Sequence, residues 1–253
     1  MTAIDESCWL YRISIFGIVQ FTIISSIEEG YFLKILTVSD QVDPQVYSDN
    51  LKDRFGDVEF VISCGDLSYM YLEYILTILD RPLYFVHGNH DPVQEQNMGD
   101  PRPYPFGGIN LHRKIIREHD LLLAGIEGSI LYNRRTPYQY SQASMWNHVL
   151  LLVPGLIYNR LFFGRYLDIF VSHAPPRGVH EKSDWTHQGI NAFRWLIDTF
   201  KPAYHLHGHI HYYRPDETVQ TQVGKTSVIN TFRSRLININ LNDSGANNKE
   251  ELD

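Results

Sequence analysis

The apolar residues in the first third of the chain predict strands and helices in alternation. Three continuous apolar runs have the length and the β-branched content of buried strands: residues 33–38, 58–63 and 83–86. Helical spacing fills the gaps between them, over residues 44–55 and 71–79. Pro44 suits a first helical turn, and Arg81-Pro82 stops the second helix. This strand–helix–strand–helix–strand order predicts a parallel sheet with right-handed crossovers, and therefore an α/β fold.

The remainder of the chain predicts further strands and helices after a Pro-rich loop at 91–110. Strands are expected at 111–116, 121–126, 167–171 and 204–206, and helices at 142–152, 154–163 and 188–200. Asp184 or Thr186 is the candidate N-cap of the last helix. Residues 219–241 predict antiparallel strands that turn at Gly224-Lys225. We therefore expect one domain over residues 32–241, followed by a disordered polar tail at 242–253.

Residues 1–31 form an N-terminal extension to which the pattern assigns no role. Residues 13–27 are apolar and uncharged, but a spanning helix needs about 20 apolar residues. Asp5 and Glu6 do not match the basic start of a secretory signal. An appendage is favoured over a membrane contact, and no clear membrane span is expected.

Composition and charge narrow the classes of function. The net charge is −7 and there is no long basic run, so extended binding to nucleic acid is disfavoured. A local basic patch would still permit it. Cys8 and Cys64 form neither a metal-type nor a redox pair, which favours a reducing compartment and a cytoplasmic protein.

Polar side chains with the chemistry of metal ligands follow five of the strand-like runs. They are Asp40, Asp66, Asn89 with His90, His173, and His209 with His211. Because residues just past the carboxyl ends of parallel strands meet in one crevice, these donors can converge. Carboxylate, amide and imidazole groups there can hold two divalent metals that clamp a phosphoryl group. Asp66 is the natural bridge, His90 the candidate general acid, and Asp91 its supporting neighbour in the catalytic loop.

In order and spacing these residues resemble the motifs of calcineurin-like metallophosphoesterases. The matching segments are Asp40, Gly65-Asp66, Gly88-Asn89-His90-Asp91, His173 and Gly208-His209-Ile210-His211, within residues 33–241. The resemblance implies a four-layer sandwich of two mixed β-sheets flanked by helices, with a dinuclear metal site. It implies that Asp40 and His211 hold the first metal, Asn89, His173 and His209 the second, and Asp66 both. A metal-bridging hydroxide would then attack phosphorus while His90 protonates the departing oxygen.

The chain departs from the family pattern at Val42. The first family motif usually reads Asp-any-His, whereas this chain has Asp40-Gln41-Val42, and valine cannot coordinate a metal. Water or Asp43 would have to fill the gap. We expect weaker binding at the first site, with Mn²⁺ the favoured metal and Fe, Zn or Mg as alternatives.

The sequence thus predicts a metal-dependent hydrolase of a small phosphate monoester or diester. A nuclease-like phosphodiesterase is the rival among enzymes. The rival from another class is a non-catalytic interaction module with a degraded first metal site, which Val42 supports. In the loop after His173, the residues Arg177, His180 and His187 suit a substrate-facing role as well as a purely structural one. The pattern indicates no oligomeric state.

Overall fold

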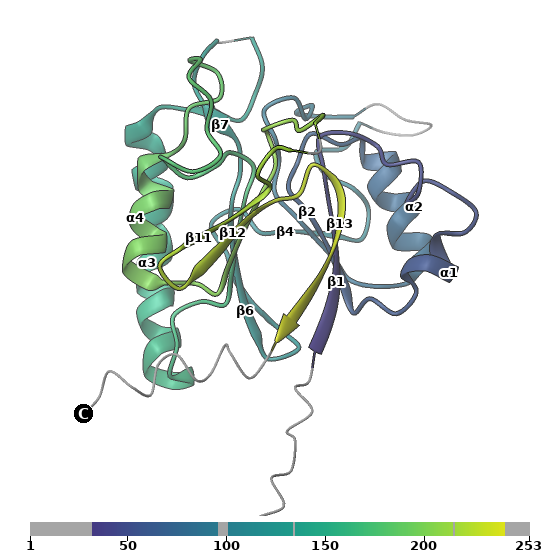
Figure 1. Cartoon of the computed structure of the whole chain (residues 1–253), viewed down its shortest axis with the longest axis horizontal. Helices are drawn as coiled ribbons and strands as arrows, with labels where there is room; N and C mark the ends of the chain where they lie inside the picture. Colours follow the sequence, from purple (N-terminus) through teal and green to yellow (C-terminus); the bar gives the residue numbers. More distant parts are fainter. Residues whose placement is uncertain (1–31, 96–100, 134, 215, 241–253) are drawn as a thin grey trace, which may run out of the picture.

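The chain forms two mixed β-sheets that lie face to face, with helices on both outer faces (Figure 1). The computed structural model describes residues 32–95, 101–133, 135–214 and 216–240. The N-terminal extension at 1–31 and the tail at 242–253 lie outside the described residues, so the expectations for them stay predictions.

The first sheet has the strand order β13-β1-β2-β3-β4. Its strands are β1 (Phe32–Ser39), β2 (Phe60–Ser63), β3 (Leu83–Phe85), β4 (Gly108–Asn110) and β13 (Arg233–Asn240). Strands β1 to β3 run parallel, as the alternating pattern predicts. β4 adds a fourth parallel strand within residues 91–110, where the sequence predicts a loop. β13 closes the sheet by pairing antiparallel with β1 along its whole length.

The second sheet has the strand order β11-β12-β10-β9-β6-β5. Its strands are β5 (Ile115–Glu118), β6 (Leu121–Ile126), β9 (Ile169–Ser172), β10 (Tyr204–His207), β11 (Gln220–Val223) and β12 (Thr226–Asn230). The four inner strands are parallel, and the edge strands β5 and β11 are antiparallel to their neighbours.

Alternate residues of β1 explain why apolar side chains occur on both faces of the strand. Leu33 and Ile35 face the second sheet and belong to the core between the sheets. Leu36 and Val38 point to the opposite face and contact residues of the covering helices. Since successive side chains of a strand point to opposite faces, a strand covered on both sides needs apolar residues on each face.

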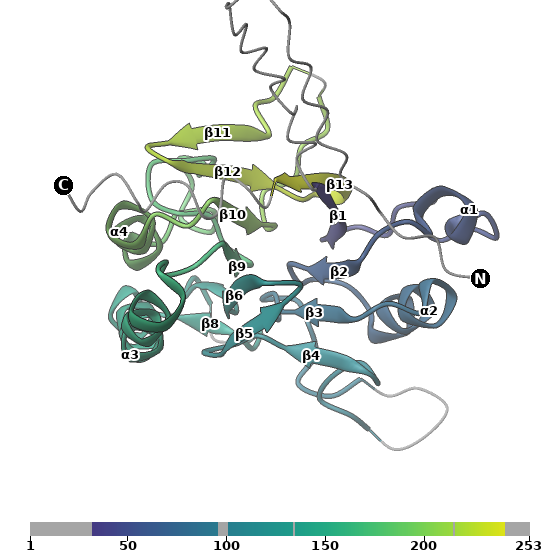
Figure 2. The same cartoon turned by 90° about the horizontal axis from the view of Figure 1, so that it is seen from below.

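Helices cover the outer face of each sheet, and Figure 2 shows the resulting layers end-on. α1 (Leu51–Phe55) and α2 (Tyr69–Leu79) lie on the first sheet, while α3 (Gln142–Phe163) and α4 (Asn191–Phe200) lie on the second. The four-layer sandwich is therefore confirmed. Among the described residues, none of the helices combines the length and the apolar character that crossing a bilayer requires.

Three predictions about helix boundaries are wrong. α1 begins at Leu51 rather than at Pro44, because the Asp43 side chain accepts a hydrogen bond from the Gln45 amide and holds a turn there. α3 continues through Pro154 as one helix. α4 begins at Asn191 with Ile190 as its N-cap, and neither Asp184 nor Thr186 caps it.

A short parallel pair of strands escaped prediction. β7 (Ser129–Ile130) pairs with β8 (Gln139–Tyr140), and the segment between them carries Tyr132. The strand expected at 111–116 is shifted to β5, beginning at Ile115.

Candidate metal centre

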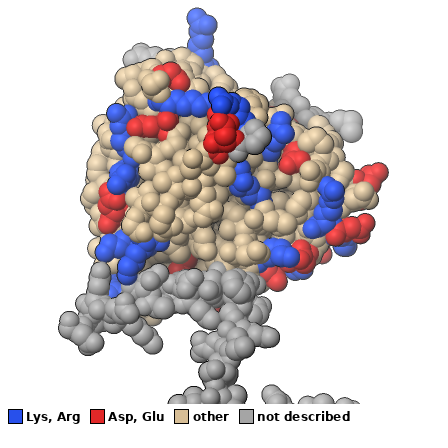
Figure 3. Space-filling view, in the orientation of Figure 1, with Lys and Arg blue, Asp and Glu red and all other residues tan. Residues whose placement is uncertain are grey.

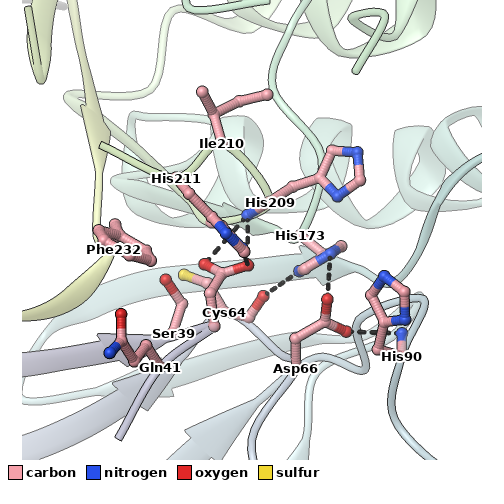
Figure 4. Close-up of polar contacts among 12 residues, drawn as sticks. Ser39, Gln41, Cys64, Asp66, His90, His173, His209, Ile210, His211 and Phe232 are labelled. Carbon is pink, nitrogen blue, oxygen red and sulfur yellow. Dashed lines mark hydrogen bonds and ion pairs between the residues drawn. The ribbon is translucent and has the colours of Figure 1, made fainter. Parts of the chain in front are cut away.

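The predicted ligand residues meet where the carboxyl ends of the two sheets' parallel strands come together. Asp40 follows β1, Asp66 lies just past β2, and Asn89 lies past β3. His173 directly follows β9 of the second sheet, and His209 lies past β10. Hydrogen bonds and ion pairs link these residues across the gap between the sheets (Figure 4).

Sharp turns aim three of the candidate ligands into the centre. Asp40, Asp66 and His209 have φ angles of 65°, 59° and 65°, in the left-handed region that side chains with a Cβ disfavour. Gly88 makes room for one of them, since a Cβ there would lie 2.0 Å from Oδ1 of Asp66. Three of the converging residues therefore have a strained backbone, as do eight other described residues that carry a side chain.

Asp66, His173 and His209 form the tightest group of donors. One ligand atom from each lies within 4.8 Å of the others. Nε2 of His173 lies 3.3 Å from Oδ2 of Asp66 and 3.0 Å from Oδ1 of Asn89. Four donors from both sheets therefore face one point, and their oxygen and imidazole chemistry suits a divalent transition metal.

Backbone carbonyls fix the rings of both histidines. Nδ1 of His173 donates to the Cys64 carbonyl at 2.8 Å, which turns Nε2 towards Asp66. Nε2 of His209 donates to the Thr186 carbonyl at 2.9 Å, which leaves Nδ1 as the free nitrogen. Hydrogen bonds of this kind set which nitrogen is available to a metal.

The paired charges of His173 and Asp66 show that the centre can stabilise a positive charge. Burial opposes protonation of His173, but the Asp66 carboxylate outweighs it and raises the pKa of His173 to about 9. Burial likewise disfavours the Asp66 carboxylate, yet the His173 charge and the His90 amide lower the pKa of Asp66 to about 2. Burial lowers the pKa of His209 to about 3, so its ring is neutral. A divalent ion would take the place of the proton on His173.

The remaining predicted ligands, Asp40 and His211, lie next to each other beside the His209 backbone. Both oxygens of Asp40 accept from the His209 amide, at 2.9 and 3.1 Å, and Oδ1 lies 3.6 Å from Nε2 of His211. The His211 ring is stacked on Phe232, and its Nδ1 lies 3.1 Å from the Tyr213 hydroxyl. These contacts direct Nε2 of His211 towards Asp40.

Asp43 does not take the place of the histidine that Val42 replaces. Its carboxylate accepts from the Gln45 amide at 2.9 Å and from the Ser234 hydroxyl at 2.5 Å. Val42 itself lines a small, mainly apolar hollow with Tyr47 and Met70. Of the residues predicted for the first metal site, Asp40, Asp66 and His211 remain as candidate ligands.

His90 and Asp91, the predicted catalytic pair, occupy different environments. His90 is exposed in the wall of a cavity of about 200 Å³, and its amide donates to Oδ1 of Asp66 at 2.7 Å. Asp91 is buried behind it, and its carboxylate accepts from the amides of Gly88 (2.8 Å) and Leu67 (3.0 Å). Asp91 thus holds together the loops that carry Asp66 and His90.

Three further residues line the cavity: Tyr132, Thr186 and His187. His187 is one of three substrate-facing candidates from the sequence, and Asp184 holds its Nδ1 at 2.7 Å. The other two candidates point elsewhere: His180 bonds to His207, and Arg177 pairs with Glu181. Tyr132 was missed because nothing in the local pattern links it to Asn89, 43 residues earlier.

Comparison with known proteins supports the same interpretation. The sequence model of the calcineurin-like phosphoesterase family matches residues 29–213. No curated protein matches the chain. One solved crystal structure is 13% identical, with a TM-score of 0.57, covering 82% of this chain and 95% of its own. The protein TT1561 of Thermus thermophilus is 14% identical, with a TM-score of 0.50, covering 83% and 99%. At these identities the structural likeness shows the fold alone.

Proposed function

Because this chain belongs to the calcineurin-like phosphoesterase family, we propose that it is a metal-dependent hydrolase of small phosphate esters. The observation that carries the proposal is the convergence of Asp66, His173 and His209 beside a cavity with His90 in its wall. A carboxylate, two oriented imidazoles and an adjacent general acid form a set that phosphoryl transfer needs.

The donors fit two divalent ions of unequal affinity. Asn89, His173 and His209 would hold one ion, Asp40 and His211 the other, and Asp66 both. Such ions supply an activated nucleophilic oxygen and draw charge from the phosphoryl group. We propose that the Asp40 site is the weaker, since Val42 offers no ligand and Asp43 is engaged elsewhere. Oxygen-rich shells of this kind favour Mn²⁺ or Mg²⁺, with Fe and Zn as alternatives.

His90 is the residue we propose to protonate the departing oxygen. It lies in the cavity wall. The hydrogen bond from its backbone N–H to the Asp66 carboxylate fixes its distance from the metal donors. Asp91 has a supporting role. Its carboxylate accepts hydrogen bonds from the backbone amides of Leu67 and Gly88, and these hold the His90 loop against the Asp66 loop. A general acid must be held within hydrogen-bond reach of its target, and this arrangement supplies the restraint.

We propose a small soluble phosphoester as the substrate. The cavity of about 200 Å³ fits a phosphoryl group with a modest organic part. On the face drawn in Figure 3, basic and acidic side chains are interspersed, which gives an extended nucleic-acid backbone little to follow. A cytoplasmic location is our expectation from the cysteine usage.

A non-catalytic interaction module is the second candidate, and Val42 is the observation in its favour. Elemental analysis of the purified protein, with assays of a chromogenic monoester and diester in Mn²⁺, separates the possibilities. Two bound metals with hydrolysis support the enzyme with both sites filled, and one metal with weak hydrolysis supports a depleted first site. Absence of both metal and hydrolysis would support the module.

Replacement of Asp66 tests the enzymatic proposal directly. Asp66→Asn keeps the size of the side chain but removes the charge shared by both sites, so we expect kcat to fall at least about 100-fold and metal content to fall with it. Asp198→Asn, on the exposed face of α4, is the matched control and should keep both. Hydrolysis by Asp66→Asn equal to that of the parent would overturn the proposal.

A further inference from the structure

Tyr132 lies in the wall of the cavity beside the candidate ligands. It follows β7, and its backbone is fixed because Oε1 of Gln139 accepts from the amides of Tyr132 (3.1 Å) and Asn133 (3.0 Å). Its side chain lines the same cavity as Asp66 and His90. The segment between β7 and β8 therefore delivers a phenol to the candidate centre.

The Tyr132 hydroxyl accepts a hydrogen bond from the side chain of Asn89. Nδ2 of Asn89 donates to the Tyr132 hydroxyl at 2.9 Å, while Oδ1 of the same amide faces Nε2 of His173 at 3.0 Å. Asn89 is fully buried. The bond to Tyr132 therefore helps to hold the Asn89 amide in place while Oδ1, the atom able to bind a metal, is directed towards His173.

The same bond leaves the phenol's own proton available. The hydroxyl accepts from Asn89 and carries one hydrogen of its own, and within the described residues that hydrogen is committed to no acceptor. The hydroxyl lies in the wall of a cavity that also contains His90. A phosphoryl oxygen is a strong acceptor, and a hydrogen bond to a charged oxygen is roughly twice as strong as a neutral one.

We propose that Tyr132 positions Asn89 as a metal ligand and binds an unesterified phosphoryl oxygen of the substrate. The second half rests on the proposed hydrolysis, and the first half only on the proposed metal site at Asn89, His173 and His209. The two halves are linked because one hydroxyl serves both: it accepts from the ligand amide and donates into the cavity. Tyr132 thereby couples occupation of the Asn89–His173–His209 site to recognition of the phosphate.

Tyr132→Phe removes the hydroxyl and keeps the ring. We expect Mn²⁺ to bind about tenfold more weakly in calorimetric titration, because Nδ2 of Asn89 loses its acceptor and the side chain is held less firmly. At saturating Mn²⁺, we expect KM for a chromogenic monoester and Kd for inorganic phosphate both to rise about tenfold. kcat should change less, since the contact is made to the ground state and the transition state alike.

Tyr138→Phe is the matched control in the same segment, because its ring stacks on His87 and its hydroxyl is not bonded to Asn89. It should leave Mn²⁺ and phosphate binding unchanged and unfold at the parent's temperature in EDTA. Tyr132→Phe should unfold at a somewhat lower temperature, because Nδ2 of the buried Asn89 loses its acceptor. Parent-like Mn²⁺ affinity in Tyr132→Phe would overturn the positioning role. Parent-like phosphate Kd at saturating Mn²⁺ would overturn the substrate contact. If the parent hydrolyses no ester, the proposed function fails, yet the two titrations still decide the role of Tyr132.

Discussion

At Gly88 the backbone comes so close to Asp66 that a side chain there would displace the carboxylate. A Cβ at this position would lie 2.0 Å from Oδ1 and 2.6 Å from the amide nitrogen of Asp66. The Gly88 amide is in turn bonded to Asp91 at 2.8 Å. A single residue without a side chain thus determines where the proposed bridging ligand lies.

Gly88→Ala should therefore remove metal binding. We expect the displaced Asp66 to lower the bound metal to below half of the parent's content and kcat by at least about 100-fold, measured by elemental analysis and chromogenic assay. Gly164→Ala is the control: its φ of 75° adds backbone strain, but no atom lies within 4 Å of the new Cβ. It should cost about 1 kcal/mol of stability and keep its metal. Full metal content in Gly88→Ala would show that Asp66 can move without consequence.

Among individual residues, those that follow strands in an ordered motif could be predicted, and those brought in by a long-range contact could not. Asp66 and His173 follow from their places at strand ends. Tyr132 depends on a contact with Asn89 that no local pattern encodes. Asp91 was predicted beside His90, but its burial and its bond to the Leu67 amide become visible only in three dimensions.

α3 shows how packing overrides a local signal at the scale of an element. Pro154 lacks an amide hydrogen, so a helix normally stops there. In α3 the apolar side chains on both sides of Pro154, including Val149 and Leu156, pack into one core on the second sheet. Leu150, whose carbonyl loses its helical partner, is half exposed, and water can reach that side of the helix.

Pro154→Ala should stabilise the protein. The new amide can bond to the Leu150 carbonyl and the ring clash disappears, so we expect the free energy of unfolding in urea to rise by about 1–3 kcal/mol. Leu151→Ala, also exposed on α3, is the control and should change it by no more than about 0.5 kcal/mol. A less stable Pro154→Ala protein would mean that the proline ring itself is needed for packing.

The other errors at this scale have the same origin. Spacing alone extended α1 back to Pro44, but the bond between the Asp43 side chain and the Gln45 amide holds a turn there. The order of the strands within each sheet could not be predicted from the hydrophobic pattern either, because β13 pairs with β1 across almost the whole chain. Periodicity locates elements, whereas side-chain hydrogen bonds and distant pairing decide their limits and neighbours.

On the scale of the whole molecule, the candidate centre joins the two sheets. Asp66 and Asn89 come from the ends of the first sheet, and His173 and His209 from the ends of the second. The His173 ring already bridges this boundary through Asp66 and the Cys64 carbonyl. A metal bound there would add bonds between the two sheets, and these bonds would exist only in the folded state.

Metal removal should therefore lower thermal stability. A ligand at 100 times its Kd stabilises the folded state by about 2.7 kcal/mol. For a domain of this size that corresponds to a Tm roughly 5–10 °C higher in Mn²⁺ than in EDTA, measured by differential scanning fluorimetry. Asp66→Asn should show a much smaller difference. An equal shift in that variant would place the stabilising ion elsewhere.

The pairing of β1 with β13 also sets a schedule for biosynthesis. β1 is the first described strand to leave the ribosome, yet Ser39 pairs with Arg233, roughly 190 residues later. At about 5–20 residues per second, one edge of β1 waits roughly 10–40 s for its partner. During that interval its backbone groups are open to wrong partners, as those of any bare sheet edge are. Asp40, at the end of β1, also awaits the His209 amide. The nascent chain therefore depends on protection of β1 until its last strand has been made.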